Sequence, residues 1–189
     1  MKNLKQVFYA PNQLTLLRLV FIPFVILSIV VGQYGTAFVL VLIAGVSDVL
    51  DGVLARRLGQ QTTLGSYLDP IADKLLLTSS FVVLGLERHI PLWLVILVLS
   101  RDIIILTTAL VMILTTPLRP PRPSIFGKLN THAQVATVLL TLLTLLDSNG
   151  TLRWLQQGMV YATATLTVVS GLHYAFTTAE RLRNMERAP

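Results

Sequence analysis

The chain has 189 residues, of which 53% are hydrophobic and only 13% charged, and its mean hydropathy is +0.71. This composition excludes an ordinary soluble domain, because a soluble fold of this size could not cover so much apolar sequence. The formal charge of +6 does not indicate nucleic-acid binding, because the basic residues gather at the ends of apolar runs, where they suit anionic lipid headgroups and phosphate substrates.

Six apolar runs, bounded by Gly, Pro or charged residues, are predicted to cross a membrane as helices, since about 20 residues span a hydrocarbon core of about 30 Å. The first run has no small-residue cleavage site and is expected to stay in the protein. The opening ten residues predict either a short N-terminal interfacial helix or a solvated tail. The predicted fold class is therefore all-α and polytopic, with residues 1–189 as a single membrane domain. The predicted spans are 14–31, 36–55, 71–86, 91–115, 132–146 and 158–177.

The distribution of Lys and Arg predicts the orientation of these spans. Only Arg88 and Arg153 fall at one end of the predicted bundle, whereas ten basic residues fall at the other. Both termini and the 56–68 connection are therefore expected on the cytoplasmic side of the membrane, the bacterial inner membrane being the expected setting. The ten are Lys2, Lys5, Arg56, Arg57, Arg119, Arg122, Lys128, Arg181, Arg183 and Arg187.

Four of the nine acidic residues lie within 26 residues, where one apolar run ends and the next begins. Asp48 and Asp51 are spaced i, i+3, and Asp69 and Asp73 are spaced i, i+4, so each pair is expected on one helical face. Ionisable groups at membrane depth usually mark a functional site. The alternative is that they cap helix ends or pair with basic neighbours such as Lys74.

Four carboxylates at close quarters repel one another unless cations neutralise them. Because the chain has no cysteine, any metal must be held by oxygen or imidazole ligands. Oxygen ligation suits hard divalent ions, and phosphate chemistry favours Mg²⁺ or Mn²⁺. We therefore predict two divalent ions, a pair able to clamp the attacking and leaving oxygens of a displacement at phosphorus.

The neighbours of the aspartates include small residues and a cation. Gly52 and Ala55 would allow a phosphorylated ligand close to the helix, or would let helices pack closely. Arg56, one turn after Asp51, is placed to meet a phosphate, the alternative being an anchor at the membrane surface.

These residues together resemble the signature of the CDP-alcohol phosphatidyltransferases. The chain reads Asp48-x-x-Asp51-Gly52-x-x-Ala55-Arg56, eight residues, then Gly65-x-x-x-Asp69-x-x-x-Asp73, and no position departs from the family pattern. The resemblance implies that Asp48, Asp51, Asp69 and Asp73 bind the metals and that Asp73 is also the base. It further implies a homodimer and a CDP-linked donor held by Gly52, Ala55, Arg56, Thr62 and Gly65.

The first run carries Asn12, Thr15 and Arg18, followed by Pro23, and is similar to the opening of the phosphatidylglycerophosphate synthase and cardiolipin synthase branches. This likeness places Asn12 and Thr15 with the donor-binding residues. If this likeness is set aside, Asn12 or Thr15 could instead be a helix N-cap, and the Arg18 side chain could extend toward the membrane surface.

The acceptor is predicted from the fourth span and the connection that follows it. Arg101 lies too deep to reach the surface easily, so it is expected to face a polar cavity or to pair with Asp102. Family members that use glycerol 3-phosphate typically carry Arg-Glu and Gly-Lys-x-Lys-Thr, whereas this chain has Arg101-Asp102 and Gly127-Lys128-Leu-Asn130-Thr131. The likeness slightly favours phosphatidylglycerol as the acceptor, with glycerol 3-phosphate as the alternative. The expected acceptor-binding residues are Arg101, Lys128, Arg119, Arg122 and Asn130, of which the cations could instead be surface anchors.

Two other classes of function are weaker. In a cation-coupled transporter the carboxylates would form an ion pathway, but the sequence has no visible inverted repeat and the acidic cluster lies toward one face. A purely structural membrane subunit would leave the four aspartates unexplained. An assay of CMP release from CDP-diacylglycerol would distinguish an enzyme from both of these alternatives.

Overall fold

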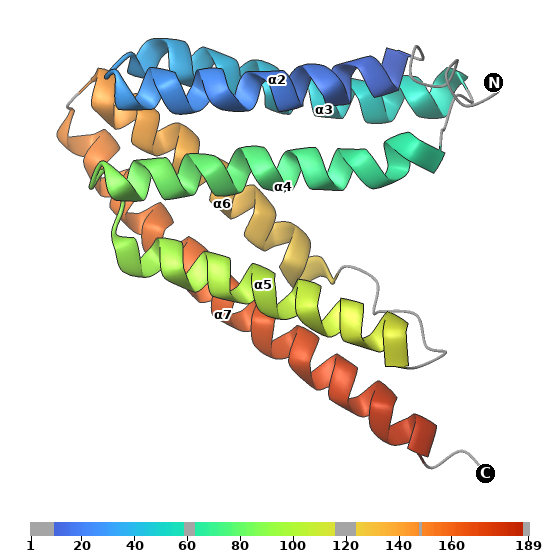
Figure 1. The fold of residues 1–189 in the computed structure, drawn as a ribbon. Helices are drawn as coiled ribbons and strands as arrows, with labels where there is room; N and C mark the ends of the chain where they lie inside the picture. Colours follow the sequence, from blue (N-terminus) through green and yellow to red (C-terminus); the bar gives the residue numbers. More distant parts are fainter. Residues whose placement is uncertain (1–9, 59–62, 116–123, 148, 187–189) are drawn as a thin grey trace.

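The computed structural model describes the backbone of residues 10–58, 63–115, 124–147 and 149–186, and the side chains of 19–47, 74–115, 124–147, 149–181 and 183. These ranges contain six helices and no strand, which confirms the predicted all-α class (Figure 1). The opening residues, for which an interfacial helix was predicted, lie outside the described ranges. The helices are α2 (Ala10–Val30), α3 (Tyr34–Leu58), α4 (Thr63–Leu86), α5 (Leu92–Thr115), α6 (Ile125–Leu146) and α7 (Gly150–Glu186).

All six helices coincide with predicted spans, but several begin earlier or end later than the apolar runs. Helix α6 begins at Ile125 rather than 132, because Ser124 caps it by accepting a 3.1 Å hydrogen bond from the backbone N–H of Gly127. Polar residues such as Lys128 end an apolar run without ending a helix. Helix α2 does end at a predicted breaker, since Gly32 adopts a φ of 78°, which favours glycine.

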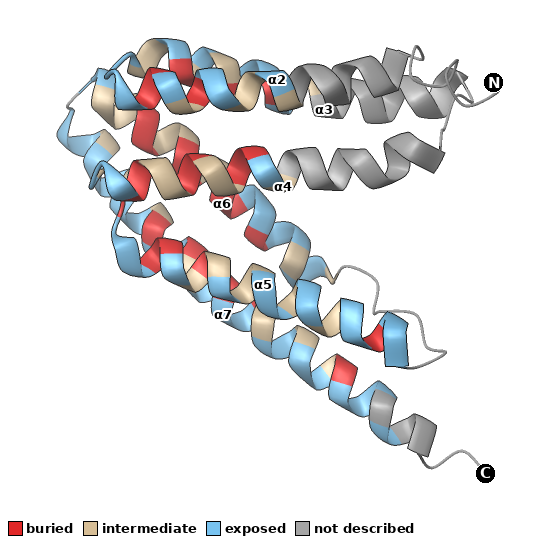
Figure 2. Cartoon of the chain, viewed as in Figure 1, coloured by how far each residue is buried: buried red, intermediate tan, exposed pale blue. Residues whose placement is uncertain are grey.

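The helices form a bundle that opens toward the end carrying the described ends of the chain (Figure 1). The α2–α3, α4–α5 and α6–α7 connections lie together at the opposite end. Helix α2 packs on α3 and α4, α6 packs on α7 and α3, and α5 packs on α7, while α4 also contacts α5 and α6. Among the described side chains, buried residues of α2, α4 and α5 gather toward the connected end (Figure 2). They include Val25, Ile29, Phe81, Leu84, Leu94 and Val98.

Two described helices, α5 and α6, are long and apolar enough to cross a membrane. Only 17% of the apolar window of α5 is buried within the chain, so this helix is unlike the core helix of a soluble protein. Shorter apolar stretches lie in α2, α3 and α4, at Leu19–Val30, Tyr34–Ser47 and Lys74–Leu86. The described structure thus supports membrane character for two helices, and six spans remain a prediction.

Gly85 allows the close turn between α4 and α5. A Cβ atom at Gly85 would lie 2.6 Å from Cγ2 of Val95 on α5, closer than real Cβ contacts. Gly45 of α3 is a matched control, because a Cβ atom there would have nothing within 4 Å.

We expect Gly85→Ala to lower the free energy of unfolding by about 1–3 kcal/mol through overpacking. Gly45→Ala should instead raise it by about 0.5–1 kcal/mol, because alanine is the better helix former. Thermal unfolding of both purified variants in the same detergent measures the difference. Equal stability of the two variants would contradict the close α4–α5 contact.

Candidate active site at the open end of the bundle

The four aspartates lie on two helices, α3 and α4, toward the open end of the bundle. Asp48 and Asp51 fall in the second half of α3, and Asp69 and Asp73 in the first half of α4. Figure 1 shows the end of α3 and the beginning of α4 at the same end of the bundle. The helical backbone confirms that each pair has the spacing of one helix face. Their side chains lie outside the described ones, so metal binding stays a prediction.

The residues expected to bind the donor come from three helices, two of which pack on the third. Gly52, Ala55 and Arg56 belong to α3, Gly65 to α4, and Asn12 and Thr15 to α2. Helix α2 contacts both α3 and α4, so the fold brings these segments to one end of the bundle. Thr62 lies outside the described residues, as do the side chains of the other six.

A cluster of charged side chains includes Lys74, which directly follows Asp73 on α4. We call Lys74 of α4, Arg101 and Asp102 of α5, and Ser170 of α7 the charged cluster. Asp102 divides its carboxylate between two cations, with Oδ1 2.9 Å from Nη1 of Arg101 and Oδ2 2.7 Å from Nζ of Lys74. Arg101 also donates from Nη2 to the Ser170 hydroxyl. The charged cluster therefore ties α4, α5 and α7 together.

Burial differs among the members of the charged cluster. The side chains of Arg101 and Asp102 are each 13% exposed, whereas that of Lys74 is 39% exposed. With two cations and one carboxylate, the formal charge is +1. The remaining accessible positive charge is thus carried mainly by Lys74.

Two glycines, one on α6 and one on α7, lie close to Arg101. A Cβ atom at Gly127 would lie 3.4 Å from Nη2 of Arg101, and one at Gly171 would lie 3.5 Å from its Cγ. The Arg101 side chain therefore lies against both helices, with the Ser170 hydroxyl accepting a hydrogen bond from its guanidinium. Arg101 was predicted to face a polar cavity or to pair with Asp102, and the structure confirms the pair.

The predicted acceptor residues do not all reach one surface. Asn130 is fully buried, and its Oδ1 accepts a 2.9 Å hydrogen bond from the Thr167 hydroxyl of α7. Lys128 lies two residues before Asn130 on α6. Because residues two apart on a helix point in different directions, Lys128 is exposed although Asn130 is buried. Arg119 and Arg122 lie outside the described residues. In this conformation Asn130 belongs to the α6–α7 contact rather than to an accessible site.

Asn130 is part of a row of buried polar side chains between α6 and α7, which we call the polar seam. The hydroxyls of Thr137 and Thr163 lie 2.8 Å apart across it. Gln134 is only 1% exposed, and neither polar atom of its side chain has a hydrogen-bond partner. Hydrogen bonds between helices, such as the one that joins Thr137 and Thr163, hold membrane helices together. The seam consists of Asn130, Gln134, Thr137 and Thr141 on α6 and Thr163, Thr167 and Ser170 on α7.

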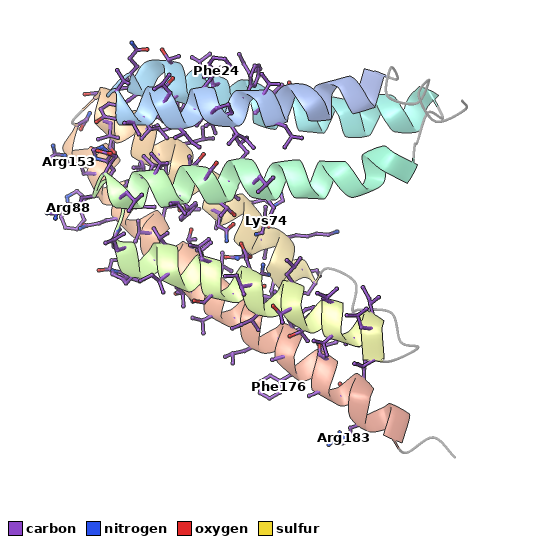
Figure 3. All side chains as sticks on the ribbon, in the orientation of Figure 1. Phe24, Lys74, Arg88, Arg153, Phe176 and Arg183 are labelled. Atoms are coloured by element: carbon purple, nitrogen blue, oxygen red, sulfur yellow. The ribbon has the colours of Figure 1, made fainter. Side chains whose placement is uncertain are left out.

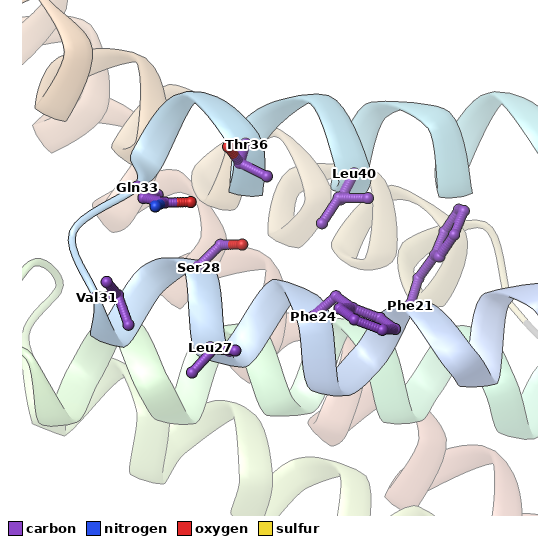
Figure 4. Close-up of a pocket in the computed structure, with 8 residues that line it drawn as sticks. All are labelled: Phe21, Phe24, Leu27, Ser28, Val31, Gln33, Thr36 and Leu40. Carbon is purple, nitrogen blue, oxygen red and sulfur yellow. The ribbon is translucent and has the colours of Figure 1, made fainter.

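Two pockets among the described residues differ in their lining. A pocket of about 430 Å³ lies between α2 and α3, on the side of their connection (Figure 4). Its wall includes Phe21, Phe24, Leu27 and Leu40 and has no ionisable side chain. A second pocket, of about 260 Å³, lies between α4 and α5 and includes Lys74, Arg101 and Asp102. Of these two pockets, only the second has charged side chains among its described lining, and one of them, Lys74, directly follows Asp73 in the sequence.

Sequence reasoning missed three contributors to this region. Lys74 was considered only as an ion-pair partner of the aspartates, and Ser170 and Gly171 were not identified. The position of Lys74 directly after Asp73 was an available signal. A serine and a glycine inside an apolar run resemble ordinary helix-packing residues, so nothing local distinguished Ser170 and Gly171.

Comparison with known proteins gives a consistent result. The family model for CDP-alcohol phosphatidyltransferase matches residues 8–169. A probable cardiolipin synthase (CMP-forming) of Drosophila melanogaster is 34% identical over 87% of this chain, although the match covers only 56% of that protein. A CDP-diacylglycerol–glycerol-3-phosphate 3-phosphatidyltransferase of Bacillus subtilis is 30% identical over 93% of this chain and 98% of its own length. A probable phosphatidylglycerophosphate synthase of Mycobacterium tuberculosis is 33% identical, with 86% and 78% covered.

Proposed function

The chain belongs to the CDP-alcohol phosphatidyltransferase family, and we propose that it transfers the phosphatidyl group of CDP-diacylglycerol to a glycerol-type acceptor with release of CMP. The observation that supports this most strongly is the eight-residue signature on α3 and α4, with its two aspartate pairs on helical backbone. A cation-coupled transporter finds no comparable support.

The residues present fit a site for two Mg²⁺ or Mn²⁺ ions. Asp48, Asp51, Asp69 and Asp73 offer only carboxylate oxygens, which are ligands that these hard ions prefer. When bound, the ions would neutralise the pyrophosphate of the donor and the charge that develops on its leaving oxygen. Gly52, Ala55 and Gly65 would leave room for the cytidine diphosphate, which Arg56, Thr62, Asn12 and Thr15 would contact.

The reaction then needs one proton transfer and one displacement at phosphorus. Asp73 takes the proton of the acceptor hydroxyl, as a general base within hydrogen-bond reach would. The acceptor oxygen forms a bond to the lipid-side phosphorus while the bond from that phosphorus to the bridging oxygen breaks. CMP leaves with the bridging oxygen, and the proton on Asp73 passes to water.

Phosphatidylglycerol is the acceptor that we favour, which would make the product cardiolipin. The pairs Arg101-Asp102 and Lys128-x-Asn130 support it, because the chain lacks the second lysine expected for a phosphate dianion. Glycerol 3-phosphate is the second candidate, favoured by the match to nearly the full length of the Bacillus subtilis relative.

We also propose that the chain crosses the membrane six times as a homodimer with its active site on the cytoplasmic side. Arg88 and Arg153 lie at the connected end of the bundle and Arg183 toward the opposite end, as the predicted orientation requires (Figure 3). An excess of basic residues at the cytoplasmic end is the usual pattern.

The deciding experiment measures CMP release from CDP-diacylglycerol by the purified protein with Mg²⁺ or Mn²⁺. We expect release with phosphatidylglycerol, little with glycerol 3-phosphate, and none after EDTA treatment. Release with glycerol 3-phosphate alone would assign the second acceptor. No release with either acceptor would contradict the proposed acceptor class.

A further inference from the structure

The pocket between α4 and α5 combines charge with an apolar wall. Lys74, Arg101 and Asp102 lie at it, and the other described residues of its lining are Thr78, Leu99, Ile103, Ile105 and Leu106. Ile103 and Leu106 are 62% and 74% exposed, so the apolar side opens outward from the bundle. In a membrane such a surface meets lipid chains.

Lys74 is the group in this pocket that can bind a ligand. Its Nζ lies 2.7 Å from Oδ2 of Asp102, and the side chain remains 39% exposed, so the ammonium group can also meet a second partner. Figure 3 labels Lys74 in the region where α4 and α5 face one another. Arg101 is less accessible, because Asp102 and Ser170 engage two of its three nitrogen atoms.

The charge and shape of the pocket together select a class of ligand. The charged side chains that the structure describes in it, Lys74, Arg101 and Asp102, sum to +1, which complements the single negative charge of one phosphodiester. An apolar wall that opens outward suits an acyl chain. Glycerol 3-phosphate has a dianionic phosphate and no chain, so it matches neither property.

We propose that the α4–α5 pocket binds the lipid acceptor, an anionic glycerophospholipid of the phosphatidylglycerol type, with its phosphate on Lys74 and one acyl chain along Ile103 and Leu106. This inference rests on the proposed function, because it assigns the pocket to the acceptor of that reaction. Lys74 directly follows Asp73, the expected base, in the sequence, and this adjacency supports the acceptor over the donor.

A site-specific quenching experiment tests the pocket independently of turnover. Because the chain has no cysteine, Ile103→Cys provides a single thiol for a fluorophore. Ile104→Cys is the matched control, since Ile104 is 59% exposed at nearly the same depth but does not line the pocket. Both labelled proteins are placed in phosphatidylcholine nanodiscs that contain a small fraction of chain-nitroxide phosphatidylglycerol or phosphatidylcholine.

We expect phosphatidylglycerol to quench the Ile103→Cys label more than phosphatidylcholine does, and both lipids to quench the Ile104→Cys label equally. Lys74→Met should weaken the apparent affinity for phosphatidylglycerol by about fivefold, the effect of one cation near an anionic headgroup. Lys74→Arg should retain the preference for phosphatidylglycerol. A loss seen only in Lys74→Met would then reflect the missing charge rather than a folding defect.

Equal quenching of the Ile103→Cys label by the two lipids would overturn the proposal. So would displacement of nitroxide phosphatidylglycerol by CDP-diacylglycerol but not by unlabelled phosphatidylglycerol, because the pocket would then belong to the donor. A quenching preference without CMP release from phosphatidylglycerol would instead leave the pocket intact and contradict the proposed reaction.

Discussion

Asp73→Asn is expected to lower the rate of CMP release by about 100- to 10,000-fold, the usual contribution of a general base. Asparagine keeps the size of the side chain but cannot accept a proton near neutral pH. The rate is measured at saturating metal and CDP-diacylglycerol, so that a weaker metal site is not mistaken for loss of the base.

Asp147→Asn is the control for this change. Asp147 is exposed at the end of α6, near the connected end of the bundle, and its backbone N–H bonds to Leu143, a contact that asparagine preserves. The control should keep the full rate. Full activity of Asp73→Asn would remove Asp73 from the role of base while leaving the family assignment untouched.

Arg101→Met is expected to lower the free energy of unfolding by about 2 kcal/mol. Removing one partner of a buried ion pair costs about 3–5 kcal/mol, and the cost is smaller here because Asp102 keeps Lys74 and the pair is not fully enclosed. Thermal unfolding in detergent or nanodiscs measures the change. Arg101→Lys should recover only part of it, because an ammonium cannot reproduce the two-armed contact with Asp102 and Ser170.

Arg153→Met provides the comparison, since Arg153 is exposed at the connected end of the bundle. Its effect should stay within about 0.5 kcal/mol, as for most surface substitutions. If Arg101→Met were as stable as Arg153→Met, the charged cluster would not hold α5 to α7.

The sequence predicted the helices well because apolar runs and breakers act locally. It placed α5 within one residue, since Pro91 and the Pro117–Pro123 stretch bound that run on both sides. It placed the start of α6 seven residues late. The first turns of α6 carry polar side chains such as Lys128, so they do not belong to an apolar run although they are helical.

The candidate site was predictable to a different degree. The spacing of the aspartates predicted their pairing on helices α3 and α4, since that pairing depends on helical periodicity alone. The burial of Asn130 and the contacts of Arg101 depend on how α6 and α7 pack against one another and against α5. A hydropathy pattern does not predict such contacts between helices. Lys74 illustrates the same limit, because its partner Asp102 is 28 positions away along the chain.

The polar seam bears on how the protein is assembled. Helix α7 is not among the described helices that are long and apolar enough to cross a membrane unaided, and Thr163, Thr167 and Ser170 lower its affinity for lipid. Those three side chains are buried once α7 lies against its neighbours, and the two threonines hydrogen-bond to Thr137 and Asn130 of α6. If α6 and α7 enter the bilayer as a hairpin, as the proposed topology requires, Thr163 and Thr167 would be hydrogen-bonded to α6 rather than facing hydrocarbon.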